Sequence, residues 1–340
     1  MQNASSAKTS ERETGTRFLD RFKAKVRSTN PILELAIVLP GLVAAGWIWV
    51  PLGVITHSTF FEYAGYFVVG AFLTWMAMIA HAIRKRNLDD LGFTSIKRFG
   101  KNLQSIKQRR EAWNYFLIVG TILAGYFIFL VNFLPFTSLI PFLGEINTFI
   151  AGIVHPAVNV IIATLEFLFF GVFTAFYFFK TDNIKASLLR HAKYGTPVLL
   201  FLFTFAMIVN QDKVFSQTFM KVVAHFLGYI FWAMFQQIPT LVYVNTSMRE
   251  GLEKSTRITS PSKRRFLAAF VTASFFAILH FPAFILAMIA FTFEFILSMI
   301  YYDKKFRNVF VACLLHAATG VIVVFFLDID LIAGYVGWLG

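Results

Sequence analysis

Three short groups of polar residues lie inside apolar stretches of the chain, and their residue types could support chemistry. Gln236 and Gln237 form the first group. The second reads Phe276-x-x-x-His280, and the third begins at His316 as His-x-x-x-Gly. Because polar side chains at membrane depth are costly, three such groups in successive apolar segments indicate a site and not chance.

Several known chemistries for cutting peptides inside a membrane are excluded by the sequence. A serine nucleophile on a G-x-S-x-G turn is absent, and so is an H-E-x-x-H zinc helix. An aspartyl dyad needs two carboxylates at equal depth, but Asp303, Asp328 and Asp330 all lie at the ends of apolar spans. The remaining pattern is the pair of histidines, His280 and His316.

The composition indicates a multi-pass membrane protein. Hydrophobic residues make up 57% of the chain, charged residues 14%, and 43 of the 340 residues are Phe. The net charge of +13 comes from basic clusters between the apolar runs, which is a topology signal and argues against nucleic-acid binding. The single cysteine, Cys313, excludes an intrachain disulfide and a cysteine-based metal cluster.

Apolar runs long enough, or nearly long enough, to cross a bilayer predict an all-α, polytopic fold with about nine transmembrane helices. The predicted spans are 31–56, 60–83, 112–134, 152–179, 195–211, 222–245, 266–281, 283–302 and 308–327. Pro282 ends the seventh span, so we expect that segment to be a partial span or a tilted pair with the eighth.

Basic clusters alternate with loops that carry few basic residues, which predicts a cytosolic N-terminus in a plasma (inner) membrane. We expect the basic clusters to contact anionic lipid headgroups. The chain is divided into a basic tail (1–30), N-terminal membrane helices (31–221) with a cytosolic amphipathic segment (84–111), a core (222–328) and a C-terminal tail (329–340).

The segment that holds the two histidines resembles the CPBP family of intramembrane metallo-endopeptidases, which includes the type II CAAX prenyl proteases. The family reads Glu-Glu-x-x-x-Arg, Phe-x-x-x-His and His-x-x-x-Asn (or a small residue in place of Asn) on successive helices. The resemblance covers 222–328, and Asp90-Leu91-Gly92 is similar to a stretch that often precedes the family's core. It implies a core formed by the last four helices, a divalent metal such as zinc near the histidines, and a membrane-embedded peptide as substrate.

The chain departs from the family at the residues that would activate water. Gln236 and Gln237 stand in place of the paired glutamates, Leu241 in place of the arginine, and Gly320 in place of the asparagine. An amide can form hydrogen bonds but cannot take a proton from water, and it is a poor zinc ligand beside imidazole. Loss of a general base typically costs about 10²–10⁴ in rate.

Glu294 is a candidate to replace the missing glutamates. Gln237, Glu294 and His316 each lie 8 residues from the same end of their apolar runs. At 1.5 Å per residue, all three are expected about 12 Å below one membrane face. Glu294 could therefore complete a metal site with His280 and His316. The alternative for each of these residues is a hydrogen bond between helices, which contributes about 0.6–2 kcal/mol.

Three functions follow from these residues. We favour a CPBP-like protein with impaired or no proteolysis that keeps its polar pocket for a membrane peptide or partner protein. The alternative is an active intramembrane metallopeptidase with a zinc ion on His280, His316 and Glu294. A small-molecule transporter is a further alternative, although no internal repeat supports it.

Overall fold

The computed structural model describes residues 19–49, 52, 56, 58–86, 89–93, 183–281, 283–327 and 329. Every regular element within these ranges is a helix, which confirms the predicted all-α fold. The predicted spans at 112–134 and 152–179 lie outside the described residues, as do most of the segment 84–111 and nearly all of the tail 329–340. The number of nine membrane crossings therefore stays a prediction.

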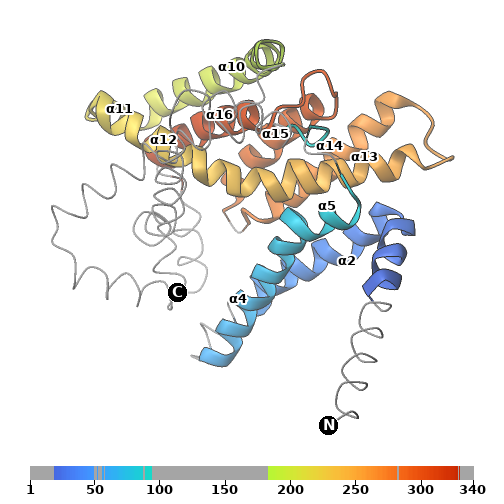
Figure 1. The fold of residues 1–340 in the computed structure, drawn as a ribbon. Coiled ribbons are helices and arrows are strands. Elements are labelled where there is room, and N and C mark those ends of the chain that lie inside the picture. Colours follow the sequence, from blue (N-terminus) through green and yellow to red (C-terminus); the bar gives the residue numbers. More distant parts are fainter. Residues whose placement is uncertain are drawn as a thin grey trace, which may run out of the picture. The chain divides into compact units, whose positions relative to one another are not determined.

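The N-terminal helices match the predicted spans at 31–56 and 60–83. They are α2 (Pro31–Ala44), which continues as η1 (Ala45–Trp49), and α4 (Thr59–Thr74), which continues as η2 (Trp75–Ile79) and α5 (Ala80–Ile83). Asn30 caps the start of α2, because its side chain accepts a hydrogen bond from the Ile32 amide at 3.0 Å. Figure 1 shows α2 and α4 packed side by side.

The second half of the chain supplies the remaining described helices. They are α10 (Ile184–Val209), α11 (Gln211–Phe215), α12 (Phe219–Gln237), η4 (Ile238–Asn245), α13 (Thr246–Glu253), α14 (Pro261–Ile278), α15 (Phe284–Tyr301), α16 (Val309–Gly320) and η5 (Val321–Phe326). In Figure 1, α12, η4 and α13 form one long continuous helix. α10 begins well before the predicted span at 195–211, because hydropathy marks the apolar part of a helix and misses its basic first turns.

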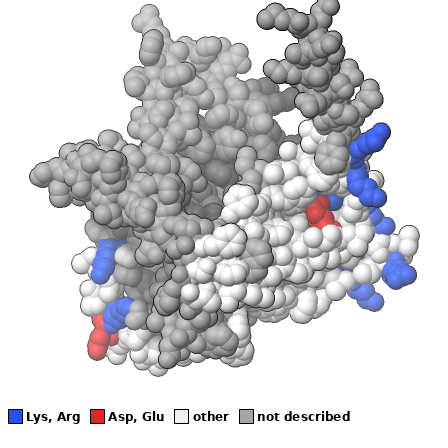
Figure 2. Space-filling model, turned by 90° about the horizontal axis from the view of Figure 1, so that it is seen from below, with Lys and Arg blue, Asp and Glu red and all other residues white. Residues whose placement is uncertain are grey.

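The described helices fit a multi-pass membrane protein. Three of them are long and apolar enough to cross a membrane: Pro31–Ile48, Ile184–Val209 and Phe284–Tyr301. The shorter helices Phe67–Ile83 and Val309–Val324 are also apolar. On the face in Figure 2, the described surface is largely uncharged and its Lys and Arg side chains lie near the edges. The cytosolic N-terminus and the plasma membrane location stay predictions.

Two clusters of buried apolar side chains hold these helices together. The first joins α2, η2, η4, α13 and α14 through residues such as Leu35, Met76 and Phe275. The second joins α10, α15 and η5 through residues such as Leu202 and Val323. The first cluster includes η4, which directly continues α12 after Gln237, and the second includes α15, which carries Glu294. Apolar packing therefore fixes both of these helical segments.

A buried carboxylate connects the N-terminal helices to η4. Glu34 on α2 accepts hydrogen bonds from Trp75 Nε1 at 2.9 Å, from the Tyr243 hydroxyl at 2.7 Å and from Arg84 Nε at 3.0 Å. The Glu34 and Arg84 side chains are only 9% and 5% exposed. A buried ion pair with its remaining lone pairs satisfied is a specific link, so the helices before residue 84 position η4.

A charged end of the helix bundle is formed by Arg86, Glu250 on α13 and Arg307. Arg86 donates two hydrogen bonds to Glu250, both at 2.9 Å. Arg307 is 2% exposed and donates to the carbonyl oxygens of Tyr301 at 3.0 Å and Asp90 at 2.6 Å. These bonds hold the Asp90-Leu91-Gly92 stretch against the connection between α15 and α16.

Candidate functional site

Gln237 bridges two helices at the centre of the candidate site. Its Nε2 atom lies 2.9 Å from Glu294 Oε2 on α15 and 2.7 Å from His316 Nδ1 on α16. Gln237 and Glu294 are fully buried, and His316 is 6% exposed. The structure thus brings together the three residues that depth counting placed at one level.

Gln236 is not part of this hydrogen-bonded group. Its side chain is half-buried, and its Oε1 atom has no hydrogen-bond partner in the described part of the chain. Its backbone carbonyl accepts a hydrogen bond from Thr240 Oγ1 at 2.8 Å. Of the two adjacent glutamines, Gln237 is the one whose side chain forms hydrogen bonds with Glu294 and His316.

His280 lies just beyond the end of α14, in the turn that leads to α15. Its Nδ1 atom is 2.7 Å from the Phe276 carbonyl oxygen, and the side chain is 9% exposed. The Phe276 ring lies 4.4 Å from the His280 ring and 5.5 Å from the His316 ring, measured between centroids. The Phe-x-x-x-His spacing therefore places one phenyl ring against both imidazoles.

The orientation of the Gln237 amide and of the Phe276 carbonyl indicates which ring nitrogen of each neutral histidine carries the proton. An amide nitrogen can only donate, so His316 Nδ1 must accept from Gln237 and the proton of the neutral ring lies on Nε2. A carbonyl oxygen can only accept, so His280 Nδ1 carries its proton and His280 Nε2 keeps its lone pair. The two imidazoles therefore have opposite tautomers.

These tautomers do not fit a zinc site on His280, His316 and Glu294. A zinc ligand must offer a lone pair, and His316 Nε2 carries a proton while Gln237 donates to Nδ1. A glutamate in place of Gln237 would accept from Nδ1–H and leave Nε2 free for a metal, which is the usual second contact of a metal-binding histidine. In the described ranges, no three His, Cys, Asp or Glu side chains are grouped closely enough to hold a metal ion.

The glycine at position 320, four residues after His316, is required by packing. Any Cβ at Gly320 would overlap the ring of Tyr229 on α12. The Tyr229 ring in turn lies 6.2 Å from the His316 ring. Gly320 thus permits the close approach of α16 to α12 that sets the distance between His316 and Gln237. Leu241, where the resemblance led us to expect an arginine, is fully buried and apolar.

Two neighbours of Glu294 were not predicted from the sequence. The hydroxyl groups of Thr240 and Ser298 adjoin its carboxyl group. Ser298 follows Glu294 by four residues on α15, so the helical period could have revealed it.

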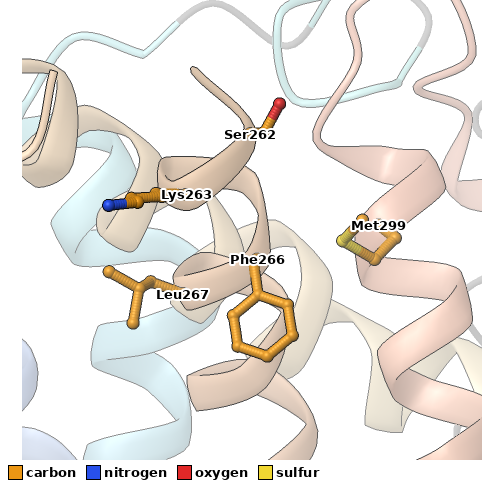
Figure 3. Close-up of a pocket in the computed structure, with 5 residues that line it drawn as sticks. All are labelled: Ser262, Lys263, Phe266, Leu267 and Met299. Atoms are coloured by element: carbon orange, nitrogen blue, oxygen red, sulfur yellow. The ribbon is translucent and has the colours of Figure 1, made fainter. Parts of the chain in front are cut away.

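A surface pocket of about 520 Å³ lies at the opposite end of α14 from His280. Phe266 and Leu267 project into it from α14, and Met299 lines it from α15 (Figure 3). It contains none of the predicted site residues. Lys263 also lines this pocket, and its contact with anionic headgroups stays a prediction.

Comparison with known families gives one match. Residues 241–322 match the model of a family described as type II CAAX prenyl endopeptidase Rce1-like. The matched segment includes His280, Glu294 and His316 and begins just after Gln237. No curated protein and no solved structure matches the chain. The match confirms the CPBP resemblance that the motifs predicted.

Proposed function

We propose that the Rce1-like segment, together with α12, binds a membrane-embedded peptide in its polar pocket without cleaving it. The observation that carries this proposal is the pair of hydrogen bonds from Gln237 Nε2 to Glu294 and His316. Those bonds engage one oxygen of the Glu294 carboxylate and leave the His316 proton on Nε2, the nitrogen that would bind a metal in a hydrolytic site. The family's architecture is kept and its proton acceptor is replaced by a proton donor.

The two imidazoles offer the hydrogen-bonding pattern of a peptide group. His280 Nε2 is an acceptor and His316 Nε2–H is a donor, and neither atom has a hydrogen bond to another described residue. A peptide group needs one acceptor for its N–H and one donor for its C=O, and an unpaired peptide group inside a membrane is costly. Phe276, in contact with both rings, supplies an apolar wall beside this pair.

Hydrolysis requires a group that removes a proton from water. The carboxylate beside Gln237 and His316 is that of Glu294, and its Oε2 atom accepts a hydrogen bond from the Gln237 amide. The amide stands between Glu294 and His316, so the carboxylate does not act on the imidazole as a catalytic partner would. Absence of a general base alone lowers a rate by about 10²–10⁴.

Peptide binding can be tested with the full chain in lipid nanodiscs. The probe is a fluorescent farnesylated CAAX tetrapeptide, chosen because the matched family is named for CAAX prenyl endopeptidases. We expect saturable binding that His316→Ala weakens by about tenfold, which corresponds to loss of one hydrogen bond of about 1.4 kcal/mol. His225→Ala, an exposed histidine on α12, should bind like the wild type.

Mass spectrometry of the same samples distinguishes binding from proteolysis. Intact peptide after long incubation with added zinc supports the proposal. Chelator-sensitive cleavage that His316→Ala abolishes would instead support the active metallopeptidase that uses His280, His316 and Glu294. Equal binding to wild type and His316→Ala would show that this pocket is not where the peptide binds.

A further inference from the structure

The surface pocket at the start of α14 combines apolar walls with one lysine. Phe266 and Leu267 on α14 and Met299 on α15 supply the apolar walls, and Ser262 and Lys263 supply the polar part (Figure 3). Its volume of about 520 Å³ falls within the range of about 300–1,000 Å³ that is usual for small-molecule sites. This lining fits a molecule that has both an apolar part and an anionic part.

Four phenylalanine rings continue the apolar wall along α14 and α15, away from Lys263. The Phe266 ring packs edge-to-face on Phe295 at 5.5 Å, and the Phe270 ring packs edge-to-face on Phe291 at 5.8 Å, measured between centroids. Phe266 and Phe270 are 51% and 45% exposed, so their rings also face outward. At 1.5 Å per residue, Phe270 lies about 10 Å beyond Lys263 along the helix. The exposed rings therefore extend the pocket along the two helices.

The charge pattern around the pocket indicates that it lies where α15 reaches the membrane surface. α15 is long and apolar enough to cross a membrane, and it begins with the exposed residues Phe284 and Ile285. Its other end is followed by Lys304 and Lys305, and residues 254–265 carry five Lys and Arg but no Asp or Glu. The pocket adjoins this basic end, and basic residues beside a membrane helix attract anionic lipid headgroups.

Lys263 is available to an anion from outside the protein, whereas the two arginines that follow it have partners within the chain. Arg264 donates to the carbonyl oxygen of Ser255 at 3.3 Å, and Arg265 pairs with Asp303 at 3.4 Å. The Lys263 side chain is exposed, and its ammonium group has no ion pair or hydrogen bond with the residues that the structure describes. The pocket therefore carries an uncompensated positive charge beside its apolar walls.

We infer that this pocket binds one anionic phospholipid, with the lipid phosphate on Lys263 and one acyl chain along the rings of Phe266 and Phe270. The ammonium group of Lys263 pairs with a phosphate oxygen, and the apolar walls fit a hydrocarbon chain. A zwitterionic lipid offers the same chain, but its choline group would bring a second cation beside Lys263. The lipid site lies at the opposite end of α14 from His280, so it does not depend on the proposed peptide binding.

Native mass spectrometry of the full chain in detergent micelles tests the headgroup contact. The chain is titrated with dioleoyl phosphatidylglycerol or with dioleoyl phosphatidylcholine, which share their acyl chains and differ in headgroup charge. We expect the first phosphatidylglycerol to bind about fivefold more tightly, which corresponds to about 1 kcal/mol for one lysine near a lipid surface. Lys263→Gln should remove this preference. Lys254→Gln is the matched control and should keep it, because Lys254 is an exposed lysine of the same basic segment that does not line the pocket.

A second pair of variants tests the acyl-chain contact in the same titration. Phe266→Ala should weaken the binding of both lipids by a similar factor, because it removes packing against a chain that the two lipids share. Phe284→Ala removes an exposed phenylalanine at the opposite end of α15 and should leave the binding of both lipids unchanged. Thermal unfolding midpoints of all four variants establish that they are folded.

Three results would overturn the lipid site. The first is equal binding of the two lipids to the wild type, and the second is an equal loss of preference in Lys263→Gln and Lys254→Gln, which would indicate a general effect of surface charge. The third is an equal effect of Phe266→Ala and Phe284→Ala. A dimer in the mass spectrum that Phe266→Ala dissociates would instead assign this surface to contact between two copies of the chain and would also overturn the inference.

Discussion

Glu34→Ala is expected to lower the free energy of unfolding by about 3–5 kcal/mol, the range for removal of one partner of a buried ion pair. The change leaves the Arg84 guanidinium buried at 5% exposure without its carboxylate. It also removes the acceptor of the Trp75 and Tyr243 hydrogen bonds. The measurement is unfolding of the full chain by SDS titration in mixed micelles.

Glu253→Ala is the control for this experiment, because Glu253 is exposed and ends α13. A surface change of that kind is expected to stay within about 0.5 kcal/mol. Tyr243→Phe, which removes a single hydrogen bond to Glu34, should cost about 1 kcal/mol. If Glu34→Ala cost no more than Glu253→Ala, the Glu34 network would not be what holds the N-terminal helices to η4.

Gln237→Leu is expected to cost about 2–4 kcal/mol of unfolding free energy, because it leaves two buried groups unpaired at once. Glu294 Oε2 and His316 Nδ1 each lose the donor that the Gln237 amide supplies. Leucine is close in size to glutamine, so the cost comes from the hydrogen bonds and not from a cavity. The same SDS titration measures it.

The neighbouring residue offers a matched control with the same chemistry. Gln236→Leu removes a side chain whose Oε1 atom is unpaired, so the change should be neutral or slightly stabilising. A large cost at Gln236 together with a small cost at Gln237 would contradict the structure of the site. Comparing the unfolding free energies of the two variants distinguishes loss of the Gln237 hydrogen bonds from loss of a polar side chain in general.

The membrane class could be predicted from the sequence, and so could the proximity of three candidate residues. Whether a segment faces lipid or water determines its apolar content and where its basic residues lie. Both properties can be read directly from the sequence. Gln237, Glu294 and His316 were placed at one level because helical rise converts residue counts into depth. Their contacts in the structure agree with that count.

Other features required the structure, because they depend on pairs that are distant in the chain. The Glu34–Tyr243 hydrogen bond joins residues 209 positions apart, and no local pattern marks it. α14 ends at Ile278, so His280 lies in the following turn and not on the helix itself. The sequence could not show that Gln237 donates a hydrogen bond to His316, since an amide group can either donate or accept.

The tautomer of His316 tests the central claim most directly. In nanodisc-embedded full chain labelled with ¹⁵N-histidine, the ring nitrogens are measured by solid-state NMR and assigned by their loss in His316→Ala. We predict an unprotonated Nδ1 and a protonated Nε2, because Gln237 donates to Nδ1. Gln237→Glu should reverse the two. A wild-type His316 with its proton on Nδ1 and a free lone pair on Nε2 would contradict the account and leave the ring ready to bind a metal.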